Sequence, residues 1–376
     1  MNEPQRLISL DVLRGITVAF MIMVNNNGDG GSAWWFMRHA DWNGMTPTDL
    51  VFPTFLFVVG VSIVFAFASR FSRGATRAQL ARQTMQRAAV LFALGLVVNG
   101  FPYFHLETLR IYGVLQRIAI CYLVAGLLHL WSGSASSKLM IAAALLLGYW
   151  VLMRWVPVPG SGLPGRDIAL LDPDANLVAW LDRQLFSAAH LYERVRDPEG
   201  MLSTLPALAT VLIGMVAGLW LQSAHLPLRK VAGLAMAAAS LLLAGYLWSL
   251  WFPLNKKLWT SSYVLVAAGW SMLALLLCFW LIDVPPRRAR AIGLMVVFGS
   301  NAIAAYMISE LLATLLWVIH WQQDGTATSL QPFLYRHLFA PLGEPALASF
   351  AYSAAFTALC FVPVWLLYRR RIFLKA

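Results

Sequence analysis

The chain has 376 residues, of which 60% are hydrophobic and 12% are charged. A soluble globular domain carries about a quarter of its residues as charged side chains, so this composition excludes that class and indicates a polytopic membrane protein. The net charge of +11 does not indicate a nucleic-acid-binding protein, because the basic residues alternate with apolar runs instead of forming one patch.

Apolar runs long enough to cross a bilayer predict an all-α membrane protein of about ten transmembrane helices. In chain order they cover residues ~8–26, 50–69, 86–104, 111–131, 138–156, 202–222, 230–251, 259–282, 292–318 and 346–368. The long connection 157–201 contains an amphipathic pattern that predicts an interfacial helix at 176–190, and a similar helix is expected at about 330–340. We expect one transmembrane acyltransferase domain over residues 1–376.

The distribution of basic residues predicts the orientation of these spans. Alternate connections are rich in positive charge, and their basic residues are Arg70, Arg73, Arg77, Arg82, Arg87, Lys138, Arg229, Lys230, Arg287, Arg288 and Arg290. If these connections face the cytoplasm, both termini are cytoplasmic. The connection between the first two spans and the acidic connection 157–201 then lie on the periplasmic side.

The connection between the first two spans carries the strongest chemical signal. Residues 34–50 contain one histidine, His39, with Asp41 and Asp49 close by in sequence. Histidine can both take and give a proton near neutral pH, so His39 is the candidate catalytic residue. A solvated loop histidine bonded to a carboxylate is the alternative interpretation.

Polar side chains within the first span are costly in lipid and therefore face a cavity or one another. Asp11 and Arg14 are three residues apart on one helix face, which is typical of a structural ion pair. Asn25, Asn26 and Asn27 end this span. They form either a simple helix stop or a site into which one amide points.

Later spans carry a second set of polar groups. Gln116 and Arg117 begin the fourth span, where they either anchor the outer leaflet or bind an anion or sugar hydroxyls. Asn301 and Glu310 lie nine residues apart within the predicted span 292–318, on roughly opposite helix sides. Lys257 precedes the eighth span and forms either a solvated turn or the edge of a substrate site.

Short sequence blocks carry a family resemblance. They are residues 9–15, 39–53, 113–119, 197–204, 255–263 and 299–303. In this order they resemble the heparan-α-glucosaminide N-acetyltransferase family of transmembrane acyltransferases, and especially its bacterial inner-membrane members.

The resemblance implies a multi-pass acetyltransferase of the bacterial inner membrane that takes acetyl-CoA from the cytoplasm. The acceptor is the amine of a glucosamine-type sugar on the periplasmic side, and a homodimer is expected. The family's catalytic histidine matches His39. The asparagine that closes the first span is also linked to catalysis, which implies Asn25, with Asn26 and Asn27 as alternatives. Direct transfer and an acetyl-histidine intermediate both remain open.

The expected sites follow from both lines of argument. The residues expected to bind the acceptor are Asp41, Trp42, Asn43, Asp49, Gln116, Arg117, Lys257, Trp259 and Glu310. The residues expected to hold acetyl-CoA are Asp11, Arg14, Arg82, Arg87 and Asn301. No metal site is expected. A transporter of amino sugars or cell-wall fragments is the alternative function, and a membrane scaffold without turnover is a third.

Overall fold

The computed structural model describes residues 7–285, 290–323 and 326–374, so Arg287 and Arg288 lie outside the described residues. The helices are α1 (Ile8–Asn25), α2 (Val51–Ser72), α3 (Arg77–Gly100), α4 (Val114–Trp131), α5 (Ala135–Trp155), α6 (Leu177–Leu185), α7 (Thr204–Gln222), α8 (Pro227–Ser249), α9 (Ser261–Cys278), α10 (Arg290–Ser300), α11 (Ala302–Val318), α12 (Leu330–Leu334) and α13 (Pro345–Arg369). Short 3-10 or π turns are η1 (Trp35–Met37), η2 (Pro47–Leu50), η3 (Leu106–Thr108), η4 (Ala188–His190), η5 (Phe279–Asp283), η6 (Tyr335–Phe339) and η7 (Ala340–Leu342).

Eight helices of the described chain are long and apolar enough to cross a membrane. They are α1, α2, α4, α5, α7, α8, α9 and α13. The bent pair α10 and α11 adds a ninth if it is counted as one span. This number is close to the predicted ten. α3 is also long enough to cross a membrane, with 24 residues, but it begins at Arg77 instead of residue 86 and carries further arginines at positions 82 and 87 in its first half.

The predicted span 292–318 is broken at Asn301, so it is not one continuous helix. There α10 and α11 meet at 80°. The Asn301 side chain binds the far end of the chain: its Nδ2 donates to the carbonyl of Ile372 at 3.1 Å, and its Oδ1 accepts from the N–H of Leu374 at 3.0 Å. The bend directs α10 along α1 and sends α11 toward the end of α1 that carries Asn25.

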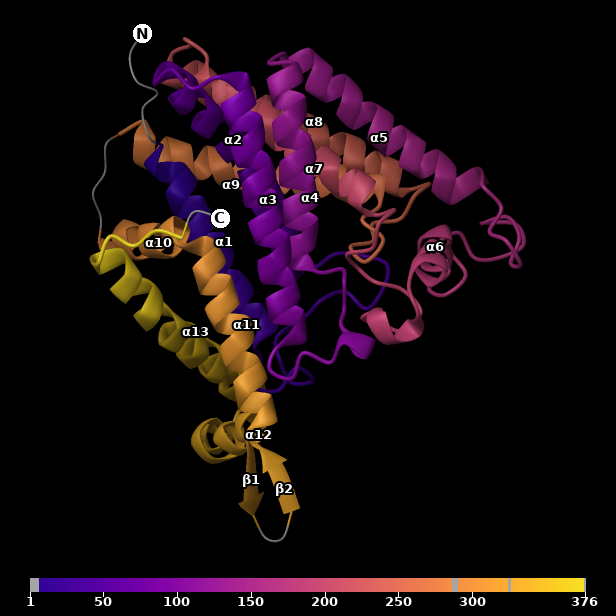
Figure 1. Ribbon diagram of the computed structural model, residues 1–376, viewed down its shortest axis with the longest axis vertical. Coiled ribbons are helices and arrows are strands. Elements are labelled where there is room, and N and C mark those ends of the chain that lie inside the picture. The colour runs from indigo at the N-terminus through magenta and orange to yellow at the C-terminus, as the bar shows by residue number, and fades with distance from the viewer. Residues whose placement is uncertain (1–6, 286–289, 324–325, 375–376) are drawn as a thin grey trace.

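Two helices predicted outside the spans are present. α6 and η4 together occupy most of 176–190, and α12 with η6 occupies 330–339. The described chain is mostly helical, as expected, and it also contains one short antiparallel hairpin that was not predicted, formed by β1 (His320–Gln323) and β2 (Thr326–Ser329). Figure 1 shows this hairpin projecting beyond the end of α11, beside α12.

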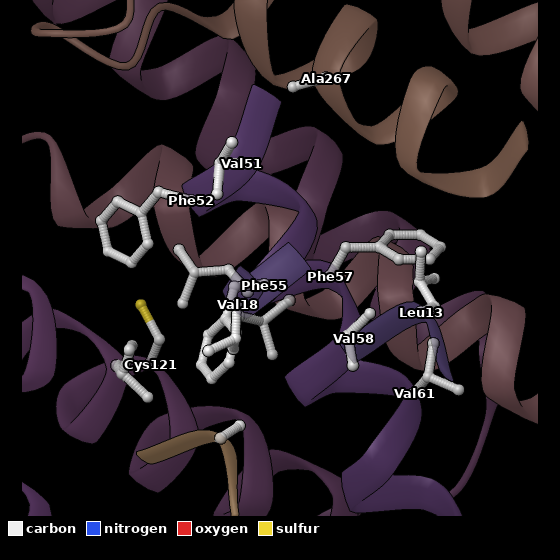
Figure 2. Close-up of a cluster of buried hydrophobic side chains, with 14 of the residues drawn as sticks. Leu13, Val18, Val51, Phe52, Phe55, Phe57, Val58, Val61, Cys121 and Ala267 are labelled. Carbon is white, nitrogen blue, oxygen red and sulfur yellow. The ribbon is translucent and has the colours of Figure 1, made fainter. Parts of the chain in front are cut away.

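The core lies where α1, α2, α4, α7 and α9 meet. Figure 2 shows Leu13 and Val18 of α1 near Phe57, Val58 and Val61 of α2. These five side chains are at most 3% exposed. The buried cluster continues into α7 and α9. The buried interior therefore runs along α2, and the loops at its first turn are fixed on a rigid element.

Glycines allow α2 and α7 to touch along their backbones. A methyl group on Gly214 of α7 would stand 2.1 Å from the carbonyl oxygen of Phe57, and one on Gly60 of α2 would stand 2.0 Å from that of Val211. Small residues at such crossings bring membrane helices together without a hydrophobic driving force. The same device joins α1 to α10, where Gly15 lies against the carbonyl of Met295.

We predict that Gly214→Ala destabilises the protein by about 1–3 kcal/mol, because the added methyl group pushes α7 away from α2. Thermal unfolding in detergent measures this as a lower Tm. Gly148→Ala in α5 is the matched control, since nothing lies within 4 Å of its added methyl group. An equal Tm for the two variants would contradict the close crossing.

Candidate active site

The polar connection between α1 and α2 folds around one buried carboxylate. Asp49 is 1% exposed, and its Oδ1 lies 2.7 Å from Nδ1 of His39. Its Oδ2 accepts the backbone N–H groups of Ala40 and Thr46 at 3.0 and 2.9 Å. The bond from the Thr46 N–H also belongs to the capping box of η2, which leads directly into α2. The structure therefore places Asp49 where it orients His39, while Asp41 is exposed at the edge.

Lys256 completes this group from the loop between α8 and α9. Its Nζ lies 2.9 Å from Nδ1 and 3.3 Å from Nε2 of His39, and 3.6 Å from Oδ1 of Asp49. Burial lowers the pKa of Lys256, while the carboxylates of Asp49 and Glu199 act to raise it. If Nδ1 donates its proton to Asp49, only Nε2 keeps a lone pair. The His39 side chain is 45% exposed, so the ring is open to its surroundings, and Nζ of Lys256 is the cation nearest to this lone pair.

A cavity of about 780 Å³ opens beside His39. Eight of the predicted site residues line it, and they are Asn25, His39, Asp41, Trp42, Asp49, Lys257, Trp259 and Glu310. They come from α1, the following connection, the α8–α9 loop and α11. The structure thus brings together residues that are up to 285 positions apart in the sequence.

The three asparagines that end α1 have different contacts. Nδ2 of Asn26 donates to the carbonyl of Ile22 at 2.8 Å, and Nδ2 of Asn27 donates to the carbonyls of Val24 and Met37. Asn25 instead lies beside the carboxyl group of Glu310, and both residues line the cavity. Asn25 is therefore the amide that faces a charged group within the cavity.

Arg110, which was not predicted as a site residue, also lines the cavity. Arg110 donates through Nε and Nη2 to the two carboxylate oxygens of Asp197 at 2.7 and 2.6 Å. Its Nη2 also bonds Glu199, and its guanidinium lies 4.6 Å from the ring centre of Tyr192. Burial lowers the pKa of Arg110, but the two carboxylates raise it above its ordinary value. Asp197 and Glu199 belong to one of the blocks that carried the family resemblance.

Asp182 of α6 holds the backbone of Asp197, the partner of Arg110. It is fully buried, and its Oδ2 accepts the N–H of Asp197 at 3.0 Å. Burial raises the pKa of Asp182 to about 6, and the neighbouring Asp197 charge acts in the same direction. Through Asp197, the long connection between α5 and α7 thereby holds Arg110 and Glu199 in place.

Trp42 lies between the cavity and this connection. Its Nε1 donates to the carbonyl of Leu171 at 2.7 Å. The guanidinium of Arg196 lies 4.6 Å from its ring centre, and Nζ of Lys257 lies 5.9 Å away. Lys257 also pairs with Glu193 at 2.9 Å. Cations therefore lie close to the ring of Trp42, which was expected to bind the acceptor.

Three residues predicted to bind the acceptor do not line the cavity. Arg117 is 1% exposed, donates to the carbonyl of Gly200 and stands 5.1 Å from the ring centre of Trp259. Gln116 is equally buried in the same turn of α4, and Asn43 accepts a hydrogen bond from Asn255 at 3.2 Å. Arg117 thus supports Trp259, a cavity residue, from behind.

The residues predicted to hold acetyl-CoA are not gathered in one place. Arg14 bonds Asp11 at 3.2 Å and Ser62 of α2 at 2.8 Å, so it joins α1 to its neighbours. Asn301 binds the carboxyl-terminal segment, as described above. Arg87 lines a second cavity at the α2–α3 turn, and Arg82 is exposed on α3.

We predict a pH-dependent contribution of Asp182 to stability. Its pKa is about 6 in the folded protein, against about 3.9 in an unfolded chain. The folded state therefore binds the proton more tightly, and stability falls as pH rises from about 4 to 6, by up to about 3 kcal/mol. Asp182→Asn should reduce the loss of Tm between pH 4.5 and 7 in detergent. The exposed Glu107→Gln serves as the control, and an unchanged pH slope in Asp182→Asn would refute the prediction.

Known proteins are similar in sequence to this chain over most of its length. The family model described as heparan-α-glucosaminide N-acetyltransferase, catalytic, matches residues 6–254. The heparan-α-glucosaminide N-acetyltransferase of Homo sapiens is 26% identical over 427 residues, which cover 99% of this chain and 60% of the human protein. The Mus musculus protein of the same name is 27% identical over 361 residues, with 83% and 54% covered. The chain spans somewhat more than half the length of these curated relatives. Because the family model matches more than half of the chain, the chain belongs to the heparan-α-glucosaminide N-acetyltransferase family.

Proposed function

We propose that the protein is a membrane acetyltransferase that moves an acetyl group from acetyl-CoA to the amine of a glucosamine-type sugar. The observation that carries this proposal is the pairing of His39 with Asp49 at the wall of the 780 Å³ cavity. A histidine whose Nδ1 is held by a buried carboxylate presents Nε2 as a base, and family membership supplies the reaction class.

In the proposed reaction, the bound sugar ammonium first loses one proton to solvent and becomes a neutral amine. The amine nitrogen attacks the thioester carbonyl while Nε2 of His39 takes its second proton, so that a C–N bond forms and the C–S bond breaks. The CoA thiolate leaves and takes a proton from the imidazolium. Asn25 is placed to donate a hydrogen bond to the carbonyl oxygen as negative charge develops. A two-step route through acetylated His39 would use the same Nε2 lone pair.

Carboxylates on the cavity wall suit a cationic acceptor. Glu193 and Glu199 pair with Lys257 and Arg110, whereas the Glu310 side chain contacts the neutral amide of Asn25. We therefore propose that Glu310 binds the sugar ammonium, because the neutral amide does not balance the negative charge of the Glu310 carboxylate. Trp259 also lines the cavity and contributes an aromatic ring to its wall.

We further propose that acetyl-CoA is supplied from the cytoplasm and that the His39 cavity faces the periplasm of a bacterial inner membrane. The basic connections at the opposite ends of the spans support this orientation. Family resemblance supports a homodimer.

We predict that His39→Ala lowers acetyl transfer about 10²–10⁴-fold, because the base is lost. Transfer of labelled acetyl from acetyl-CoA to glucosamine by purified protein in detergent measures this. His105→Ala, an exposed histidine outside the cavity, should retain wild-type activity. Equal activity of wild type and His39→Ala would remove His39 from the mechanism. Uptake of unmodified glucosamine into proteoliposomes without transfer would favour a transporter.

We predict that Glu310→Gln raises KM for glucosamine roughly 10–100-fold, since one charge-assisted contact to the ammonium is lost. The KM for acetyl-CoA should stay near the wild-type value, which makes it the internal control. If both KM values rise together, Glu310 supports the fold of the cavity instead of binding the amine.

A further inference from the structure

A second cavity of about 630 Å³ lies at the turn between α2 and α3. Its lining combines three arginines, three glutamines and two small residues, which are Arg70, Arg73, Arg87, Gln79, Gln83, Gln86, Gly74 and Ala75. Phe52 of α2 lines the His39 cavity, and Arg70 lies eighteen residues further along the same helix. At 1.5 Å per residue the two cavities are about 27 Å apart along α2.

The turn that carries this basic cavity is fixed by its own hydrogen bonds. Thr76 caps α3 and exchanges two bonds with Gln79. The backbone N–H of Ala75 donates to the carbonyl of Arg70 at 3.0 Å. Nη1 of Arg70 donates to Oε1 of Gln83 at 2.7 Å, which ties its guanidinium to α3. The arginines are therefore presented by a defined loop.

Two like charges meet in this cavity. Arg70 and Arg87 both line it, and the charge of Arg87 disfavours that of Arg70. Among the described lining residues there is no carboxylate. Guanidinium groups match the oxygens of a phosphate ester, and the glutamine amides add neutral donors. A phosphate in the cavity would relieve the repulsion.

One stripe of α3 connects the basic cavity to an apolar surface. Gln79, Gln83 and Gln86 follow helical spacing, and Val90 and Val97 continue the same stripe. All five are exposed in the described chain. The polar first half and the apolar second half of this stripe match the headgroup and acyl chains of a phospholipid. α2 is long and apolar enough to cross a membrane, so its end at Ser72 is expected near the lipid headgroups.

We propose that the basic cavity at the α2–α3 turn binds the phosphate of an anionic phospholipid, whose acyl chains lie along Val90 and Val97. The site is separate from the His39 cavity, because buried side chains of α2 such as Leu56, Phe57 and Val61 fill the interior between them. A soluble phosphate ester such as CoA offers the same phosphate chemistry but has no chains to contact the apolar stripe.

Native mass spectrometry of the detergent-purified protein tests this proposal with phosphatidylglycerol, phosphatidylcholine and CoA as separate probes. Wild type should retain phosphatidylglycerol in preference to phosphatidylcholine. Arg73→Gln/Arg87→Gln should bind phosphatidylglycerol roughly 30-fold more weakly. The matched control is Arg77→Gln/Arg229→Gln, which removes two exposed arginines at the same end of the helices and should bind like wild type.

Three outcomes would overturn the proposal. They are equal phosphatidylglycerol binding by the two double variants, no preference for the anionic lipid, and displacement of the lipid by CoA, which would identify a nucleotide site. If the double variant does not fold, Arg87→Gln alone should weaken binding by a smaller factor and keeps the test decisive. Acetyl transfer is not measured, so the result does not depend on the proposed reaction.

Discussion

The buried carboxylate of Asp49 is the group on which the candidate active site depends. One oxygen holds Nδ1 of His39, and the other closes the backbone turn that starts α2. A carboxylate taken out of water must be paired and hydrogen-bonded, and here these requirements are met by the catalytic candidate and by its own loop. The same carboxylate therefore fixes both the orientation of His39 and the position at which α2 enters the bundle.

The helix packing places this feature at the end of a rigid interior. Backbone contact between α2 and α7 through Gly60 and Gly214 leaves no room for adjustment at the centre of the bundle. The break at Asn301 then turns α11 so that Glu310 faces Asn25. The cavity therefore forms where irregular backbone is tolerated, at the end of the spans and not within the lipid-exposed middle.

The candidate site was only partly predictable from residue types and spacing. His39, Asp49 and Lys257 stood out because each lies in a short polar connection between apolar runs. Lys256 was not chosen over Lys257, since adjacent lysines in a loop give no sign of which one turns inward. Arg110 was not predicted as a site residue, because its partners Asp197 and Glu199 lie almost ninety residues away.

The sequence by itself determined the membrane class, most of the spans and the family, because hydropathy and short motifs are local properties of the chain. Only the tertiary structure decided which polar groups share a cavity, that Asn25 is the amide facing Glu310, and that the span 292–318 breaks at Asn301. It also decided that the polar half of α3 forms a basic cavity. These features depend on packing and hydrogen bonds between segments that are far apart in the sequence. Local periodicity in the sequence does not report such contacts.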